Sequence, residues 1–281
     1  YKHNFSTSAQ EWKRILDSEN TFIWYDGFCV PSSQLDDSVR WIPTYLQRCD
    51  FMIILAPGCT HFDRIDPRTQ RKMILSYRTY RLQARCVFEL FGAFLTTRGK
   101  EKARPALLIG SFASRAPSWI SPLECQTLAV GTSLFHCCES NHSTVKECRR
   151  PLFLTSLEYM IKLKSQSLFK SKTNLLEARM TRSLTHFWTR GLTHKTTQKS
   201  WDSLDEFKRD LKWNTVDTLK RNVSLLIFAV TTGSSKLVRE TLSVNKNVNA
   251  KLPQDGIVNL GLTGNMSALM IAMFVADSES V

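Results

Sequence analysis

The chain of 281 residues is 42% hydrophobic and carries a formal net charge of +13. This length and apolar content allow one large domain or two to three small ones, and they exclude a chain that is disordered throughout. No run of about 18 apolar residues is present, which argues against a membrane-spanning helix, and eight cysteines are too few for a disulfide scaffold.

The setting that these features favour is reducing and intracellular, and we expect a cytoplasmic protein. The N-terminus shows no basic segment followed by an apolar core, so no secretory signal is visible. Because the chain begins at Tyr1 rather than at a methionine, we expect it to be a fragment.

Residues 8–16 have apolar side chains at helical spacing, which predicts a helix. It leads into residues 21–31, an apolar run that ends in an acid, a glycine and a proline. Residues 22–25 are β-prone and Asp26-Gly27 is typical of a turn, which predicts a buried strand followed by a loop at its carboxyl end. Ligands of open α/β sheets bind at this end of a strand. Asp26 is therefore a candidate for contacts with the ribose of a cofactor, or for capping the turn, and the cap is favoured.

Alternating elements follow this stretch. Residues 36–49 have helical periodicity with Pro43 inside, which should shift the start of the helix or kink it. Residues 51–55 are an uninterrupted apolar run, typical of a strand buried on both faces. After a long polar loop at 59–76, residues 80–95 predict a helix and 106–109 a third strand. This order indicates a parallel sheet with right-handed crossovers.

The middle of the chain is basic, since residues 140–221 hold 17 basic and 8 acidic side chains. Residues 132–138 are a candidate strand, and residues 151–164 and 171–189 predict helices, the second ended by Gly191. Residues 192–221 are polar and rich in lysine, which suits a linker or a packing arm.

The last sixty or so residues contain an internal echo. Ser224 to Ala229 and Ser267 to Ala272 share the pattern S-ø-L-ø-ø-A, 43 residues apart, and Gly233 follows the first copy. With V-N-A at residues 248–250, the segment resembles the ankyrin repeat, with an insertion on the hairpin side. Two partial repeats are too few to bury a solenoid core, so we expect further repeats beyond Val281.

The helix at 80–95 contains Arg85-Cys86-Val87-Phe88-Glu89-Leu90. Together with the proposed strands and Pro31, it resembles the Toll/interleukin-1 receptor (TIR-like) domain, in which a W-C-x-x-E-L helix lies across from a proline-bearing loop. The resemblance covers roughly residues 5–115. The chain is also similar to large protist proteins that join such a domain to ankyrin repeats. The resemblance implies a flavodoxin-like α/β fold and self-association through the loop residues Val30, Pro31 and Ser32.

In NAD-cleaving members of this family the glutamate of the motif acts on the nicotinamide ribose, and its counterpart here is Glu89. A carboxylate in an apolar pocket can stabilise an oxocarbenium-like sugar. The family's tryptophan is replaced by Arg85, which lies four residues from Glu89 and is placed to form an ion pair with it. The ion pair is the favoured reading, and catalysis is the alternative, with NAD as substrate and no resident cofactor.

The sequence contains two further candidate sites. The densest Cys/His cluster comprises His136, Cys137, Cys138, His142 and Cys148, but the paired C-x2-C knuckles of structural zinc sites are absent, which favours no metal. The basic middle, which includes Lys162, Lys164, Arg179 and Arg182, is a third candidate, for nucleic acid or an anionic surface. No nucleic-acid module accompanies it, so nucleic acid is not favoured, and an acidic protein or a membrane surface is an equal alternative.

We therefore expect three parts: a TIR-like flavodoxin-type domain at 1–140, a basic all-α connector at 141–215 and ankyrin repeats at 216–281. The expected function is a protein-interaction scaffold in signalling. Protein partners would bind the repeats, and a homo-oligomer would form through the TIR-like part.

Overall fold

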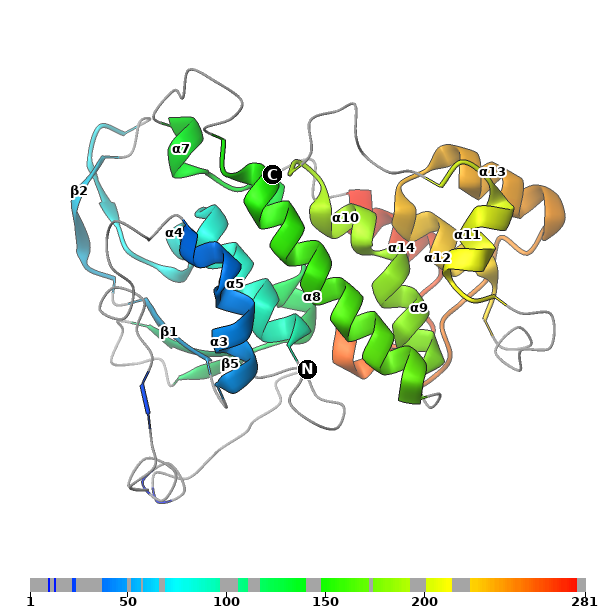
Figure 1. The fold of residues 1–281 in the computed structure, drawn as a ribbon, viewed down its shortest axis with the longest axis horizontal. Coiled ribbons are helices and arrows are strands. Elements are labelled where there is room, and N and C mark those ends of the chain that lie inside the picture. The colour runs from blue at the N-terminus through cyan, green and yellow to red at the C-terminus, as the bar shows by residue number, and fades with distance from the viewer. Residues whose placement is uncertain are drawn as a thin grey trace.

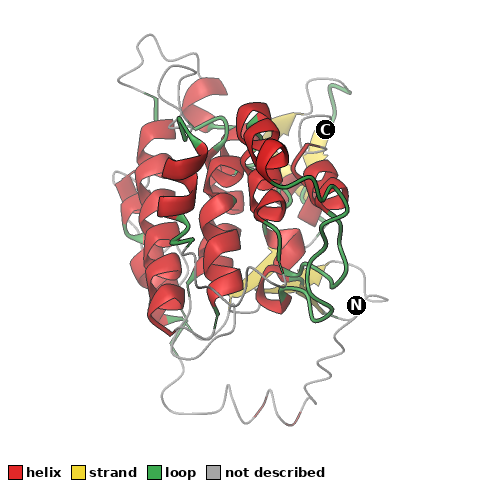
Figure 2. Cartoon of the chain, turned by 90° about the vertical axis from the view of Figure 1, so that its right-hand side faces the viewer, coloured by secondary structure: helices red, strands yellow, loops and turns green. Residues whose placement is uncertain are grey.

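The computed structural model describes residues 10, 13, 22–23, 37–49, 52–56, 58–65, 69–96, 106–110, 117–139, 148–171, 174–192, 201–213 and 223–276. Within them it is a mixed α/β protein with a small sheet and many helices, and the helices dominate the face seen in Figure 2. None of the helices in these ranges is both long and apolar enough to cross a bilayer.

The sheet consists of β1 (Met52–Ala56), β4 (Ala106–Gly110) and β5 (Ser118–Ile120), in the order β1-β4-β5. Strands β1 and β4 are parallel, with Met52 opposite Ala106, as predicted from the sequence. Strand β5 pairs with β4 in the antiparallel sense, so the sheet is mixed rather than wholly parallel. The connection from β4 to β5 is too short for the crossover of a dozen or more residues that a parallel pairing needs.

Strand β1 is buried on one face only, which corrects the expectation that both faces are covered. Ile54 and Ala56 are buried, whereas Ile53 and Leu55 are largely exposed. Helices α3 (Ile42–Arg48) and α5 (Ala84–Leu95) lie over one side of the sheet in Figure 1. An uninterrupted apolar run therefore does not by itself distinguish a strand covered on two faces from one covered on one.

The stretch at 21–31 is described only at Phe22 and Ile23. Both side chains are exposed, at 90% and 84%, and neither residue is in a strand. The expectation of a buried strand does not hold at these two positions. The described sheet has no strand beside the free edge of β1, so these residues have no ladder partner in it.

The helices before β4 follow the predicted pattern with shifted ends. A 3-10 turn, η2 (Asp37–Arg40), precedes α3, and Pro43 lies in the first turn of α3, where its missing N–H costs no hydrogen bond. The predicted shift of the helix start is confirmed. The helix expected at 80–95 is divided into α4 (Tyr77–Tyr80), which has a Ser76/Thr79 capping box, and α5.

Two expected irregular or extended segments differ in the structure. The loop at 59–76 contains an antiparallel hairpin, β2 (Thr60–Ile65) with β3 (Lys72–Ile74). The candidate strand at 132–138 instead runs from the end of the 3-10 turn η3 (Val130–Thr132) into the helical turn α7 (His136–Glu139), after a short helix α6 (Pro122–Cys125). The β-pairing described within 132–138 is a single parallel bridge between Leu134 and Gln83, because the chain turns away after one paired residue.

A 22-residue helix, α8 (Arg150–Ser171), runs between the sheet side and the C-terminal helices in Figure 1. It packs against α5 on one side and against α9 (Leu175–Ser183) on the other, and α10 (Thr185–Thr189) follows. The rings of Phe91, Phe94 and Trp188 pack edge to face, with centroids 5.9–6.4 Å apart. These contacts lock α10 onto α5.

The segment expected to be a linker or packing arm contains α11 (Leu204–Asp210), whose Leu204 and Phe207 are buried. It is followed by α12 (Leu225–Ala229), η6 (Val230–Thr232) and α13 (Ser235–Val244). A long connection that includes η7 (Val258–Leu260) leads to α14 (Ala268–Ala276). One hydrophobic core runs from Val39 to Val275, so residues of all three predicted segments share it.

Candidate functional site

A cavity of about 430 Å³ lies at the carboxyl end of β1. Its wall includes Leu55 and Ala56 of β1 and the first turn of α5. Further side chains come from the segment between β3 and α4 and from the starts of α7 and α8. Most of these groups are apolar, with Ser76, Thr79, Tyr80, Arg85 and Arg149 as the main polar contributions. A largely apolar hollow with a few convergent polar groups, at the carboxyl end of a parallel strand, is the usual form of a small-ligand site.

The first turn of α5 is held in this position by the backbone. The Ala84 N–H donates to the Leu134 carbonyl at 2.9 Å, and the Leu134 N–H donates to the Leu82 carbonyl at 2.7 Å. Phe88 and Phe91, farther along α5, are fully buried and fix the helix in the core. Arg85 and Cys86 therefore border the cavity from a rigid support.

Glu89, the candidate catalytic acid, forms the ion pair that the sequence predicts. Arg85 Nε lies 3.2 Å from Glu89 Oε1, one helical turn away, and the Glu89 side chain is 16% exposed. The cavity wall includes Arg85 but not Glu89.

Tyr80 and Arg149 also line the cavity. The sequence marks Arg149 only as part of the basic middle of the chain, and it does not single out Tyr80. Burial, followed by the charge of Glu89, raises the pKa of the Tyr80 hydroxyl well above its ordinary value. The phenol therefore stays protonated at neutral pH and remains available as a donor. Neither residue belongs to a recognisable motif, because both reach the cavity through folding of distant segments.

The other residues of the predicted site, Asp26, Val30, Pro31 and Ser32, lie outside the described residues. Their predicted position across from Glu89 stays a prediction.

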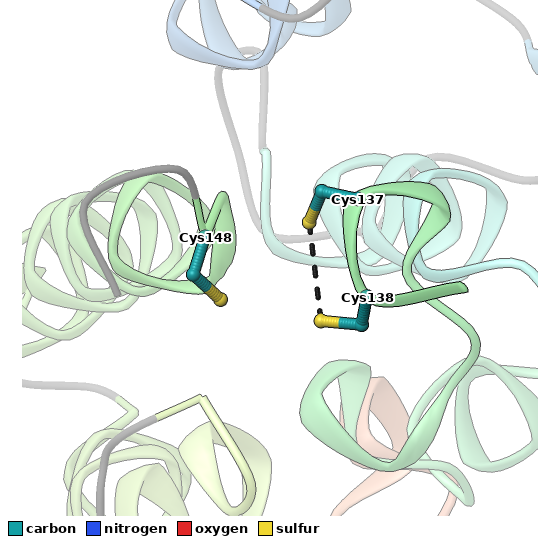
Figure 3. Close-up of side chains that lie close together, drawn as sticks. All are labelled: Cys137, Cys138 and Cys148. Carbon is teal, nitrogen blue, oxygen red and sulfur yellow. Dashed lines mark hydrogen bonds between the residues drawn. The ribbon is translucent and has the colours of Figure 1, made fainter. Parts of the chain in front are cut away.

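The cysteine cluster noted in the sequence does converge. The Sγ atoms of Cys137, Cys138 and Cys148 all lie within 4.8 Å of one another, and they point into the same space between α7 and the start of α8 (Figure 3). Burial raises the pKa of the Cys137 thiol, while the Arg149 backbone N–H lowers it. The His136 side chain and all of His142 are outside the described part of the chain.

The basic face expected at 140–221 is partly used inside the fold. Lys164 is buried beside Glu177, and Arg182 makes a two-pronged contact with Asp210 at 2.9 Å. Arg179 is also buried and donates to the carbonyls of residues 211 and 212. These three cations stabilise the helical packing. They are therefore not available to bind an anionic partner, which weakens that candidate function.

The two copies of the C-terminal echo are in different surroundings. Leu226 and Ile227 of α12 are 4% and 0% exposed, whereas their counterparts Leu269 and Met270 of α14 are 70% and 53% exposed. Met273 is also exposed, although Ile271 of the same helix is fully buried. Helix α14 therefore has one apolar face in the core and a second apolar face at the surface.

No protein family, curated protein or solved structure matches this chain.

Proposed function

We propose that this protein is an interaction scaffold, in which residues 223–276 are part of an ankyrin-like array. The observation that carries the proposal is the exposed apolar face of α14, formed by Leu269, Met270 and Met273. Apolar patches of this kind on a protein surface mark interaction sites. A helix that is apolar on all sides is normally covered on all sides.

The echo indicates what covers this face. Leu269 and Met270 are exposed in α14, whereas their counterparts Leu226 and Ile227 are buried in α12, against which neighbouring helices pack. The occupant is therefore a further helical repeat of the same kind, stacked on α14. Arrays built in this way use their extended surfaces to bind other proteins.

The helix-turn-helix geometry supports the same proposal. Ser224 caps α12 by accepting from the Leu226 N–H at 3.2 Å, and Ser234 caps α13 by accepting from the Leu237 N–H at 3.3 Å. Between them Gly233 has φ of +69°, a left-handed conformation that glycine adopts without strain. This compact helix pair, followed by a long connection to the next helix, is the unit that repeats in ankyrin-type arrays.

A fusion experiment tests the stacking face. A consensus ankyrin capping repeat joined after residue 281 of the full chain is expected to raise the melting temperature and to slow amide exchange in α14. The double variant Leu269→Glu/Met273→Glu should lose this gain, because a charged face cannot be buried by the cap. Val244→Glu is the matched control, since Val244 is an exposed apolar residue on α13. An unchanged melting temperature on fusion of the cap would count against the array.

Self-association through the proline-bearing loop is a separate part of the proposal, supported by the TIR-like resemblance. Replacing Pro31 by histidine should shift the oligomeric state measured by light scattering. An identical molar mass for both proteins at every concentration would remove this part.

A second candidate function, hydrolysis of NAD, is favoured by the cavity beside the first turn of α5. Arg85 is well placed to bind a phosphate of the substrate, and this contact would free Glu89 to act on the ribose. The test follows nicotinamide release from NAD by the wild type and by Glu89→Gln. Release that depends on Glu89 supports the reaction, and its absence at high protein concentration excludes it.

A further inference from the structure

The three clustered cysteines come from two different parts of the fold. Cys137 and Cys138 are on α7, and Cys148 lies two residues before α8. The sulfurs of Cys137 and Cys138 are 3.9 Å apart, and the Cys148 sulfur completes a triangle with no side longer than 4.8 Å. Figure 3 shows the three side chains converging on one point rather than packing back to back.

This triangle has the size of a metal site. Zn²⁺ binds thiolates at about 2.3 Å in a tetrahedron, which places two ligand sulfurs roughly 3.8 Å apart. The separation of 3.9 Å between Cys137 and Cys138 agrees with that value. It is also nearly twice the length of a disulfide bond, about 2.05 Å.

Two features of the backbone beside the cluster favour negative charge on the sulfurs. The Arg149 backbone N–H points at the Cys137 sulfur, with the nitrogen at 3.4 Å. Cys148 stands at the N-terminal side of the 22-residue helix α8, where the helix dipole favours negative charge. Three thiolates around a divalent ion leave one excess negative charge, which the Arg149 N–H and the N-terminus of α8 partly offset.

We propose that Cys137, Cys138 and Cys148 are the ligands of a zinc ion, with water in the fourth position. Thiolates are the ligands that soft and borderline ions such as zinc prefer. The ion would join α7 to the start of α8. Because Cys137 also borders the cavity at the end of β1, the ion would brace that part of its wall. This site does not depend on the scaffold function.

The spacing explains why sequence patterns miss this site. Cys137 and Cys138 are adjacent, and nine residues separate Cys138 from Cys148, so no C-x2-C knuckle exists. The fold brings the third thiol to the first two by packing the start of α8 beside α7.

Cobalt provides the most direct test, because it takes the place of zinc in tetrahedral sites and its absorption reports on its ligands. The full chain is stripped of metal with a chelator, kept reduced, and titrated with Co²⁺. One equivalent should produce strong sulfur-to-metal charge-transfer bands and the intense visible bands of tetrahedral cobalt. Added Zn²⁺ should then abolish both sets of bands by displacement.

Variants locate the site. The triple variant Cys137→Ser/Cys138→Ser/Cys148→Ser should bind Zn²⁺ more than about a hundredfold more weakly in competition with a chromophoric chelator. Cys59→Ser is the matched control, since Cys59 is an exposed free thiol on the hairpin side, and it should bind like the wild type. Circular dichroism of the metal-free proteins shows whether the triple variant is folded.

The proposal is overturned if the wild type binds Co²⁺ without charge-transfer bands, a result that needs no variant. It is equally overturned if a folded triple variant retains the zinc affinity of the wild type.

Discussion

Lys164 of α8 and Glu177 of α9 form an ion pair that is almost fully buried. Lys164 Nζ lies 3.2 Å from Glu177 Oε1, and the side chains are 3% and 7% exposed. The second carboxylate oxygen accepts from Asn259 Nδ2 at 2.8 Å. One carboxylate thus connects the two central helices to the long connection that precedes α14.

Breaking this pair should be costly. Glu177→Gln keeps an oxygen for Asn259 but leaves the Lys164 ammonium buried without its counter-charge, so we expect a loss of about 3–5 kcal/mol of unfolding free energy. Urea denaturation followed by circular dichroism measures this change. The double variant Lys164→Met/Glu177→Gln should recover most of the loss, because no unpaired charge remains.

An exposed pair serves as the control. Lys208 and Asp205 lie 3.6 Å apart on α11, with Asp205 almost fully exposed. Asp205→Asn should change stability by less than about 1 kcal/mol, since solvent-exposed pairs contribute little. Equal losses for Glu177→Gln and Asp205→Asn would contradict the importance of burial.

Gly131 is predicted to be intolerant of any side chain. A Cβ atom at Gly131 would overlap the backbone of Arg190 and Gly191, and Gly191 itself has φ of +76°. Arg150 Nη1 donates to the Gly131 carbonyl at 2.9 Å and to the Gly191 carbonyl as well. Gly131→Ala should therefore separate these turns and lower stability by several kcal/mol.

Gly110 is the matched comparison for Gly131→Ala. A Cβ atom there meets nothing within 4 Å, so Gly110→Ala should leave the melting temperature nearly unchanged. A similar fall in melting temperature for the two alanine variants would show that the close approach at Gly131 is not what matters.

The two copies of the echo predict losses of unfolding free energy of very different size for the same substitution. Leu226→Ala should cost about 2–5 kcal/mol, because it removes a buried side chain and leaves a cavity. Leu269→Ala should change stability by about 0.5 kcal/mol or less, because Leu269 is exposed. Chemical denaturation of both variants makes the comparison, and a large loss at Leu269 would mean that its face is already covered.

His186 predicts a pH dependence of stability. Burial, followed by the charge of Arg190, lowers the pKa of His186 below its ordinary value of 6.5. The folded state therefore binds fewer protons than the unfolded state between the lowered pKa and 6.5, and stability falls as the pH falls through this window. Above 6.5 this contribution is fully present and constant.

The measurement is the unfolding free energy of the wild type and of His186→Gln across this pH range. The variant has no titrating group at this position, so its curve should be flatter there. Parallel curves for the two proteins would show that His186 does not contribute to the slope.

Several features could be predicted from local sequence because their causes are local. The parallel pairing of β1 and β4 followed from two apolar runs separated by a helix. The Arg85–Glu89 ion pair followed from a spacing of four residues on one helix. Each of these depends on residues close together in the chain or on a simple order of elements.

Other features could not be predicted in this way. The antiparallel β5 and the hairpin β2–β3 have short, weakly patterned strands, and pairing rather than propensity decides them. The polar sequence around α11 left a linker and a packing arm open as alternatives. The structure shows packing, because Phe207 is fully buried with its ring edge-on to Trp201. The packing of Phe207 and Trp201 therefore holds α11 against the rest of the fold despite its polar sequence.

The sequence by itself determined the positions of most helices, the parallel strand pair and the pairing of Arg85 with Glu89, because hydrophobic period and residue spacing act over a few turns. The tertiary structure decided which apolar faces are covered, which cations are used internally and that three cysteines meet. Those outcomes depend on which surfaces come together when α8 packs between the sheet and the C-terminal helices. No local pattern contains that information, since the residues involved are distant in sequence.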